Sequence, residues 1–103
     1  MAVKVIVERV VDADKQAELA ELLQELRIRA IRQPGYVSGE TLFSVDRPGA
    51  HLVISTWRSL RDWKAWAKSR QRTEIVKKMA ALLTAPERVS VYSQSPRGLP
   101  EGA

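Results

Sequence analysis

The sequence has 103 residues, of which 45% are hydrophobic and 28% are charged, and it contains no cysteine. This balance is typical of one globular domain and too apolar for intrinsic disorder. The absence of cysteine excludes disulfides, thiolate nucleophiles and cysteine-ligated metal centres. The net charge of +5 favours anionic ligands or partners. Because no uncharged stretch approaches the roughly 20 residues of a membrane span, and no secretion signal opens the chain, we expect a cytoplasmic protein without a membrane partner.

Six regular elements are predicted, in the order β-α-β-β-α-β. Concentrations of β-branched and apolar residues predict strands from Ala2 to Val11, Tyr36 to Val45, Ala50 to Trp57 and Arg88 to Tyr92. Leucines at helical spacing predict a first helix that ends before Pro34. A second helix begins after Ser59, has a candidate break at Ser69 and ends before Pro86. The order predicts an α+β, ferredoxin-like domain over residues 1–94, with both helices on one face of a four-stranded antiparallel sheet, and a flexible tail over residues 95–103.

The first predicted strand is apolar on both faces. Side chains alternate between faces, so Val3, Val5, Val7 and Arg9 share one face, and Lys4, Ile6, Glu8 and Val10 share the other. Two helices can cover only one face of the sheet. We therefore expect the second face to pack against a second copy of the chain, as a homodimer. By strand parity, we place Arg9 on the helix-covered face and both Glu8 and His51 on the opposite face.

Three tryptophans lie within ten residues, namely Trp57, Trp63 and Trp66. Packing in the core is the usual role of such large side chains, and Trp63 is in register with Leu60 and Ala67 for that role. Trp66 lies toward the edge of the same helical stripe, where a flat aromatic ring suits a planar ligand. Both interpretations of Trp66, pocket wall and plain packing, stay open.

Arg9 lies within the most apolar strand, where an unpaired charge is costly. A structural salt bridge is the more common solution, and an anionic group of a substrate is the alternative. His51 is the only histidine, and the sequence contains no phosphate loop, dinucleotide fingerprint, nucleophile elbow or histidine-based metal motif. We predict no metal site, and we place His51 near the sheet surface as a candidate proton carrier.

Basic residues are frequent between positions 58 and 72: Arg58, Arg61, Lys64, Lys68, Arg70 and Arg72. Together with the interleaved tryptophans, they allow a nucleic-acid interface of phosphate contacts and base stacking. Such a run is more often a solvated helix face, and no known nucleic-acid-binding module matches the chain. We therefore do not expect a nucleic-acid partner.

Three segments resemble the antibiotic biosynthesis monooxygenase family: Gln33-Pro34-Gly35-Tyr36, the strand from Leu52 to Trp57 with Arg58-Ser59, and Trp63 to Ser69. The resemblance extends from about Ala2 to Tyr92. It implies a dimeric α+β barrel and a small monooxygenase that oxidises an aromatic or quinol-type substrate with O2, without a metal or flavin. A non-catalytic binding or accessory protein on the same fold is the alternative.

The resemblance also implies roles for individual residues. Arg9 and Trp66 are the expected catalytic residues, one stabilising a substrate anion and the other stacking on the substrate rings. Trp57, Trp63, His51 and Tyr92 are the expected substrate-binding residues, and a small aromatic or anionic molecule is the expected ligand. Haem-degrading relatives use an Asn, a Trp and a His. Trp66 matches that Trp, but Arg9 occupies the Asn position, the His position falls near Val76, and the chain contains no asparagine. Haem is thus the less favoured cofactor.

Overall fold

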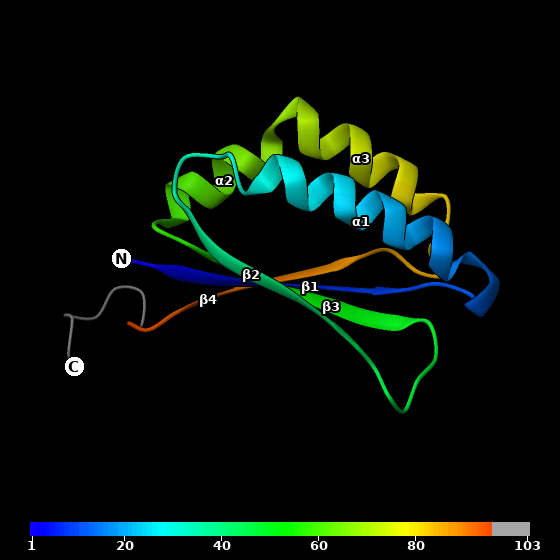
Figure 1. Cartoon of the computed structure of the whole chain (residues 1–103). Helices are drawn as coiled ribbons and strands as arrows, with labels where there is room; N and C mark the ends of the chain where they lie inside the picture. The colour runs from blue at the N-terminus through cyan, green and yellow to red at the C-terminus, as the bar shows by residue number, and fades with distance from the viewer. Residues whose placement is uncertain (96–103) are drawn as a thin grey trace.

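The computed structural model describes residues 1–95, which form one antiparallel sheet with helices on a single face (Figure 1). The spatial order of the strands is β2-β3-β1-β4, and their bounds are β1 (Val3–Val10), β2 (Tyr36–Phe43), β3 (Ala50–Trp57) and β4 (Arg88–Ser93). The helices are the short 3-10 turn η1 (Ala13–Lys15), α1 (Gln16–Ala30), α2 (Leu60–Lys68) and α3 (Arg70–Ala80). The predicted α+β, ferredoxin-like arrangement is confirmed. The predicted tail lies, apart from Ser95, outside the described residues.

The second predicted helix is divided in two at Ser69. The backbone of this residue is extended, with φ −62° and ψ 148°, and its hydroxyl oxygen accepts a hydrogen bond from the backbone N–H of Arg72 at 3.2 Å. Ser69 therefore ends α2 and caps α3. Ser59 caps α2 in the same way, because its Oγ accepts from the backbone N–H of Asp62 at 3.1 Å. The break lets residues of both helices face the sheet.

The hydrophobic core lies between the helices and the sheet and contains two clusters of buried side chains. The larger cluster is made of Val3, Val5, Val7, Ala30, Trp57, Trp63 and Trp66. The smaller cluster is made of Val11, Leu19, Ile75 and Met79, and it joins α1 to α3 at the far end of the layer. Burying each large apolar side chain contributes about 1.5–3 kcal/mol. Much of the larger cluster's apolar area belongs to the three tryptophans.

The strand register places Arg9 and His51 on the same face of the sheet. Arg9 of β1 lies directly opposite His51 of β3, and Val3 at the other end lies opposite Trp57. The prediction that His51 faces away from Arg9 was wrong. Parity orders the side chains within one strand, but the relation between two strands depends on their register, which a shift of one residue reverses. Glu8, by contrast, lies opposite Leu52 and is exposed on the outer face, as predicted.

The outer face of the sheet carries no helix from the described residues (Figure 1). Its apolar side chains are Ile6, Val10, Leu52 and Ile54, which are half-buried, and Leu42, which is exposed. Apolar side chains therefore do occur on both faces of β1 and β3. No helix among residues 1–95 is both long and apolar enough to cross a membrane.

Candidate functional site

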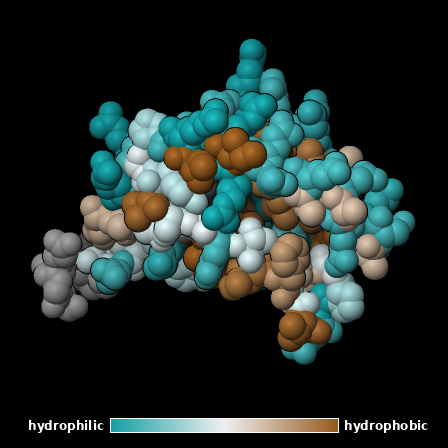
Figure 2. Space-filling model, in the orientation of Figure 1, coloured by the Kyte–Doolittle hydropathy of each residue, from teal (hydrophilic) through white to brown (hydrophobic). Residues whose placement is uncertain are grey.

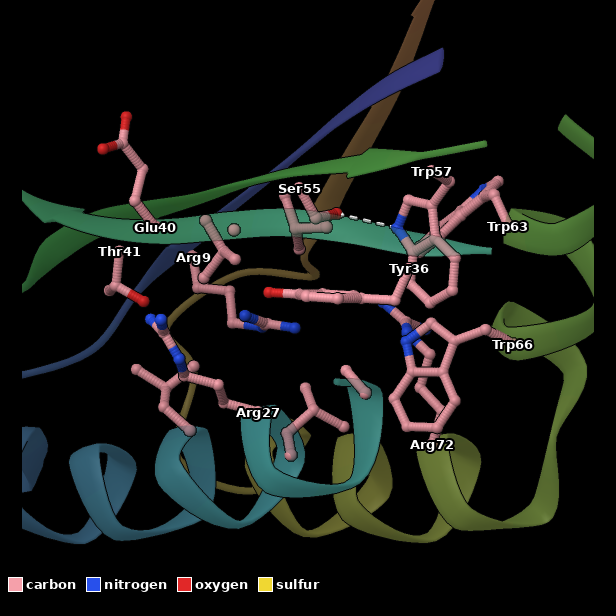
Figure 3. Close-up of a pocket in the computed structure, with 16 residues that line it drawn as sticks. Arg9, Arg27, Tyr36, Glu40, Thr41, Ser55, Trp57, Trp63, Trp66 and Arg72 are labelled. Carbon is pink, nitrogen blue, oxygen red and sulfur yellow. Dashed lines mark hydrogen bonds between the residues drawn. The ribbon is translucent and has the colours of Figure 1, made fainter. Parts of the chain in front are cut away.

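A pocket with a free volume of about 70 Å³ lies between α1 and the sheet, and α2 and α3 contribute to its walls (Figure 3). Its lining is apolar at the end near α2 and cationic toward Arg9 and Arg27. An apolar cavity that binds benzene has a volume of about 150 Å³, roughly twice that of this pocket. An aromatic ligand therefore requires a lining side chain to swing outward. Arg27 is exposed on α1, so its side chain has the freedom to move.

One end of the pocket is built from stacked aromatic rings. The rings of Trp57 and Trp66 stack with their centroids 6.3 Å apart, and Trp63 meets Trp57 edge-on at 5.9 Å. Tyr36 makes a perpendicular contact with Trp57 at 5.4 Å. The indole N–H of Trp57 donates a hydrogen bond to the Ser55 hydroxyl at 3.0 Å. Edge-to-face and offset-stacked pairs each contribute about 0.5–1.5 kcal/mol beyond their burial, so these contacts stabilise the wall.

The charged end of the pocket is lined by two arginines, Arg9 and Arg72, which pair with Glu87, a residue outside the lining. Nη2 of Arg9 lies 2.9 Å from Oε1 of Glu87, and Nη2 of Arg72 lies 3.4 Å from Oε2 of the same carboxylate. The Arg9 side chain is 1% exposed and the Glu87 side chain is 18% exposed. The guanidinium of Arg72 also lies over the ring of Trp63, 5.2 Å from its centroid, which is a cation–π contact. Two guanidiniums share one carboxylate, so this arginine–glutamate cluster has a net charge of +1.

Arg9 has unused hydrogen-bonding capacity inside this cluster. Its Nε and Nη2 bond to Glu87, but its Nη1 is buried and has no partner among residues 1–95. Burial lowers the pKa of Arg9, and so does the charge of Arg72, while Glu87 raises it. Arginine nevertheless stays protonated in proteins. An unpaired donor on a buried cation is costly. The structural salt bridge predicted from the sequence accounts for Nε and Nη2 of Arg9, but not for Nη1.

Tyr36 is a pocket residue that the sequence analysis did not nominate. Its phenol extends from β2 into the pocket, toward the side from which the Arg9 guanidinium enters (Figure 3). The phenol passes over Gly39, where a Cβ atom would lie 2.6 Å from the hydroxyl oxygen. Such a separation is too short for any real contact, so Gly39 provides the space for the hydroxyl. A glycine inside a strand often marks a close approach of this kind. Gly39 is therefore the sequence feature that could have pointed to a side chain lying over β2.

Four of the six nominated site residues lie together and two lie elsewhere. Arg9, Trp57, Trp63 and Trp66 line the pocket. Tyr92 lies opposite Lys4 on β1, which puts it on the outer face, and it is 59% exposed. Tyr92 therefore does not reach the pocket of its own chain. Among residues 1–95, no three His, Asp or Glu side chains are grouped to hold a metal ion.

His51 lies on the inner face but outside this pocket. It borders a separate hollow of about 410 Å³ at the end of the sheet, beside Phe43, whose ring centroid is 5.9 Å away. His51 is 5% exposed, and its Nε2 has no partner in the described part of the chain. Burial and the charge of Arg9 lower the pKa of His51 to about 4. The expected position near the sheet surface was wrong, because the register turns this side chain inward, and the imidazole is neutral at physiological pH.

The basic run between positions 58 and 72 does not form a continuous stacking surface. Trp63, Trp66 and Arg72 are buried, so neither the indole rings nor this guanidinium is presented to a partner. The other five basic residues are exposed, and hydrophilic residues cover most of the helical layer (Figure 2). This arrangement is that of a solvated helix face.

Comparison with known proteins places the chain in a family. Residues 2–78 match the model of the antibiotic biosynthesis monooxygenase family. The chain is 29% identical over 87 residues to the 42.8 kDa protein in the whiE locus of Streptomyces coelicolor, a match that covers 82% of this chain and 22% of that protein. The chain spans about a fifth of the length of the curated relatives it matches.

Solved structures agree with the fold. A conserved protein from Methanosarcina mazei Go1 superposes with a TM-score of 0.87 at 16% identity, covering 92% of this chain and 94% of that one. SnoaB from Streptomyces nogalater, a cofactor-independent oxygenase, superposes with a TM-score of 0.79 at 19% identity, covering 97% and 98%. The match to the family model spans most of the chain, and the protein belongs to the antibiotic biosynthesis monooxygenase family.

Proposed function

We propose that this protein is a monooxygenase that oxidises an aromatic or quinol-type substrate with O2 in the pocket between α1 and the sheet, without a metal or flavin. The observation that carries the proposal is the joining of a stacked tryptophan wall to a buried, partly unpaired guanidinium in one pocket. Membership of the family supports the reaction type. The likeness to SnoaB extends to the fold, and we carry its cofactor-independent chemistry to this chain as part of the proposal.

The reaction requires an apolar binding site and a group that stabilises the substrate anion. A methylene group between electron-rich aromatic rings releases a proton to solvent, because no lining side chain in the described chain is free to take it, and becomes a delocalised carbanion. The carbanion passes one electron to O2, and the two radicals combine into a peroxide that takes up a proton. Loss of water then leaves a carbonyl group, so the balance is CH2 + O2 → C=O + H2O. Trp66 stacks on the rings, and Arg9 stabilises the negative charge as it develops on the substrate oxygen.

The remaining aromatic side chains act on binding rather than on bond making. Trp57 and Trp63 support the face of Trp66 and exclude water, which strengthens the interaction between Arg9 and the substrate anion. His51 and Tyr92, the other two nominated residues, lie outside the pocket. The proposal therefore gives neither of them a role in the pocket of their own chain.

Oxygen uptake tests this proposal. The purified protein is given anthrones, quinols, and haem with a reductant, and O2 consumption is compared with Trp66→Phe, Arg9→Ala and, as a control, Lys64→Gln on the exposed face of α2. We expect uptake with an anthrone or quinol that falls at least tenfold in the first two variants and is unchanged in the control. Uptake no faster than autoxidation of the substrates would instead favour the binding or accessory protein.

We also propose that the outer face of the sheet pairs with the same face of a second copy. The half-buried Leu52 and Ile54 and the exposed Leu42 form an apolar strip on this face, and apolar strips of this kind mark interfaces. Light scattering coupled to size exclusion should give a dimer at micromolar concentration. Leu52→Glu should give a monomer, and Lys64→Glu on the helical face should remain dimeric. A monomeric parent protein contradicts this assignment.

A further inference from the structure

Among residues 1–95, the side chains that face into the pocket include cations and hydrogen-bond donors but no carboxylate. The titratable lining residues are Arg9, Arg27, Arg72, Tyr36 and Glu40. Glu40 lies opposite Ile54, on the outer face of the sheet, and its carboxylate points away from the pocket (Figure 3). Glu87 approaches the pocket only through its two arginines, and its carboxylate is occupied by them. The described part of the chain therefore gives the pocket an excess of positive charge and no free side-chain base to remove a proton from a ligand.

Two donors enter the pocket from different strands. The Arg9 guanidinium comes from β1 and leaves Nη1 buried and without a partner among residues 1–95. The Tyr36 hydroxyl comes from β2, and the space above Gly39 holds it in the pocket. Figure 3 shows both groups projecting into the centre of the cavity. A donor on a buried cation, a phenolic donor and an apolar aromatic wall together suit a flat molecule that carries a negatively charged oxygen.

We propose that the pocket binds its ligand as an aromatic oxyanion, a phenolate, enolate or carboxylate, and that Arg9 Nη1 and the Tyr36 hydroxyl are the two donors to that oxygen. This inference deepens the proposed function and uses the same pocket. In place of abstraction by a protein base, a bound phenol ionises as ArOH → ArO⁻ + H⁺, with the proton released to solvent. The net +1 charge of the arginine–glutamate cluster lowers the pKa of the bound phenol. A hydrogen bond from the Tyr36 hydroxyl to the ionised oxygen favours the anion further.

Small probes that cannot be oxidised under the assay conditions test the inference separately from catalysis. Benzoate and benzamide have nearly the same shape, but only benzoate is an anion, and their affinities are measured by calorimetry or tryptophan fluorescence. The third probe is 4-nitrophenol, whose anion is yellow, so absorbance reports its ionisation directly. We expect benzoate to bind at least tenfold more tightly than benzamide. We also expect 4-nitrophenol to become more yellow on binding at a pH below its free pKa.

Single-residue variants test whether Arg9 and Tyr36 each donate a hydrogen bond to the bound anion. Tyr36→Phe keeps the ring and removes only the hydroxyl, and we expect benzoate to bind about tenfold more weakly with benzamide unchanged, since hydrogen bonds to charged groups are among the stronger ones. Arg9→Met should weaken benzoate more, while Glu87 keeps its contact with Arg72. Tyr92→Phe is the same chemical change on the outer face, and it should alter neither affinity. Thermal melting of each variant confirms that it is folded.

The outcomes separate this inference from the proposed function. Equal affinities for benzoate and benzamide, or no effect of Tyr36→Phe on benzoate, would overturn the oxyanion site even if the protein consumes O2 with an aromatic substrate. Selective benzoate binding without oxygen uptake from any substrate would support the oxyanion site and reject the monooxygenase. If 4-nitrophenol still became more yellow on binding to Arg9→Met, the proposed role of the Arg9 guanidinium in ionising the ligand would be wrong.

Discussion

The two ends of the helix–sheet pocket are stabilised in opposite ways. At the aromatic end, Trp57, Trp63 and Trp66 are buried, and the indole N–H of Trp57 has its partner in Ser55. At the charged end, Arg9 and Arg72 compete for a single carboxylate, and one buried nitrogen has no partner in the described chain. Among residues 1–95, the aromatic end leaves no fully buried polar side-chain atom without a partner, and the charged end leaves Arg9 Nη1.

This difference separates stability from function within one small core. Apolar burial is non-directional and needs no partner beyond neighbouring apolar atoms, so the aromatic end is complete without a ligand. A buried cation that lacks part of its hydrogen bonding is stabilised by an anion that enters the pocket. The charged end therefore reduces the stability of the free protein and favours ligand binding, in the manner expected of sites that depart from optimal packing.

Removal of the shared carboxylate should have the largest effect on stability. Glu87→Gln leaves Arg9 and Arg72 facing each other without compensation, and breaking a buried pair in this way costs about 3–5 kcal/mol. Because the Glu87 side chain is 18% exposed, water reduces this cost and the lower value is expected. Urea denaturation measures the change. Glu74→Gln is the control, since Glu74 pairs with Arg70 at 3.8 Å on the surface and such a pair contributes below about 0.5 kcal/mol. Similar losses in both variants would contradict a special role for Glu87.

Acid should destabilise the fold through His51, which lies opposite Arg9 on the inner face of the sheet. The folded pKa of His51 is about 4, below its ordinary value of 6.5, so between these two pH values the unfolded chain binds more protons than the folded protein. Stability therefore falls as the pH drops from 6.5 toward 4. The loss is expected to be about 1–3 kcal/mol, since each unit of pKa difference corresponds to about 1.4 kcal/mol. Urea titrations at pH 7 and pH 4.5 measure it, and His51→Gln should flatten the difference between the two. An equally steep pH dependence in the variant would assign the effect to other groups.

Hydrophobic periodicity and local sequence signals were sufficient to predict the helices and strands. They also predicted part of the site, namely the tryptophans and Arg9. The strands, the break at Ser69 and the inward face of β1 follow from side-chain pattern, and so do the buried tryptophans and the buried position of Arg9. Contacts between segments that are distant in the chain could not be predicted from the side-chain pattern. Glu87 is 78 residues from Arg9 along the chain, and only the antiparallel pairing of β1 with β4 brings it near. His51 was placed on the wrong face because register is a property of two strands. The sequence predicts only that Tyr36 begins a strand, and the position of its hydroxyl in the pocket depends on the space above Gly39.

A moderate loss should follow removal of the hydrogen bond at the aromatic end. Ser55→Ala leaves the Trp57 indole N–H, which is within a residue only 1% exposed, without its acceptor at 3.0 Å. An unsatisfied buried donor costs about 1–3 kcal/mol, and the lower value is expected because the indole remains well packed. Urea denaturation measures the loss, and Ser90→Ala on the outer face of β4 is the control. The comparison of the two ends predicts that this loss is smaller than that of Glu87→Gln, and the reverse order would contradict it.

The smallest effect on stability, and the most informative effect on binding, is expected from Gly39→Ala. The new methyl group would lie 2.6 Å from the Tyr36 hydroxyl oxygen, so the end of the phenol must move away, and a flexible side-chain tip does so at a cost below about 1 kcal/mol. If the oxyanion site is correct, benzoate affinity falls about as far in Gly39→Ala as in Tyr36→Phe. In the double variant Gly39→Ala/Tyr36→Phe, no hydroxyl remains to be displaced. The benzoate affinity should therefore fall no further than in Tyr36→Phe alone, which is the non-additivity expected of residues in direct contact. Additive losses in the double variant would mean that Gly39 affects the pocket by some route other than the hydroxyl of Tyr36.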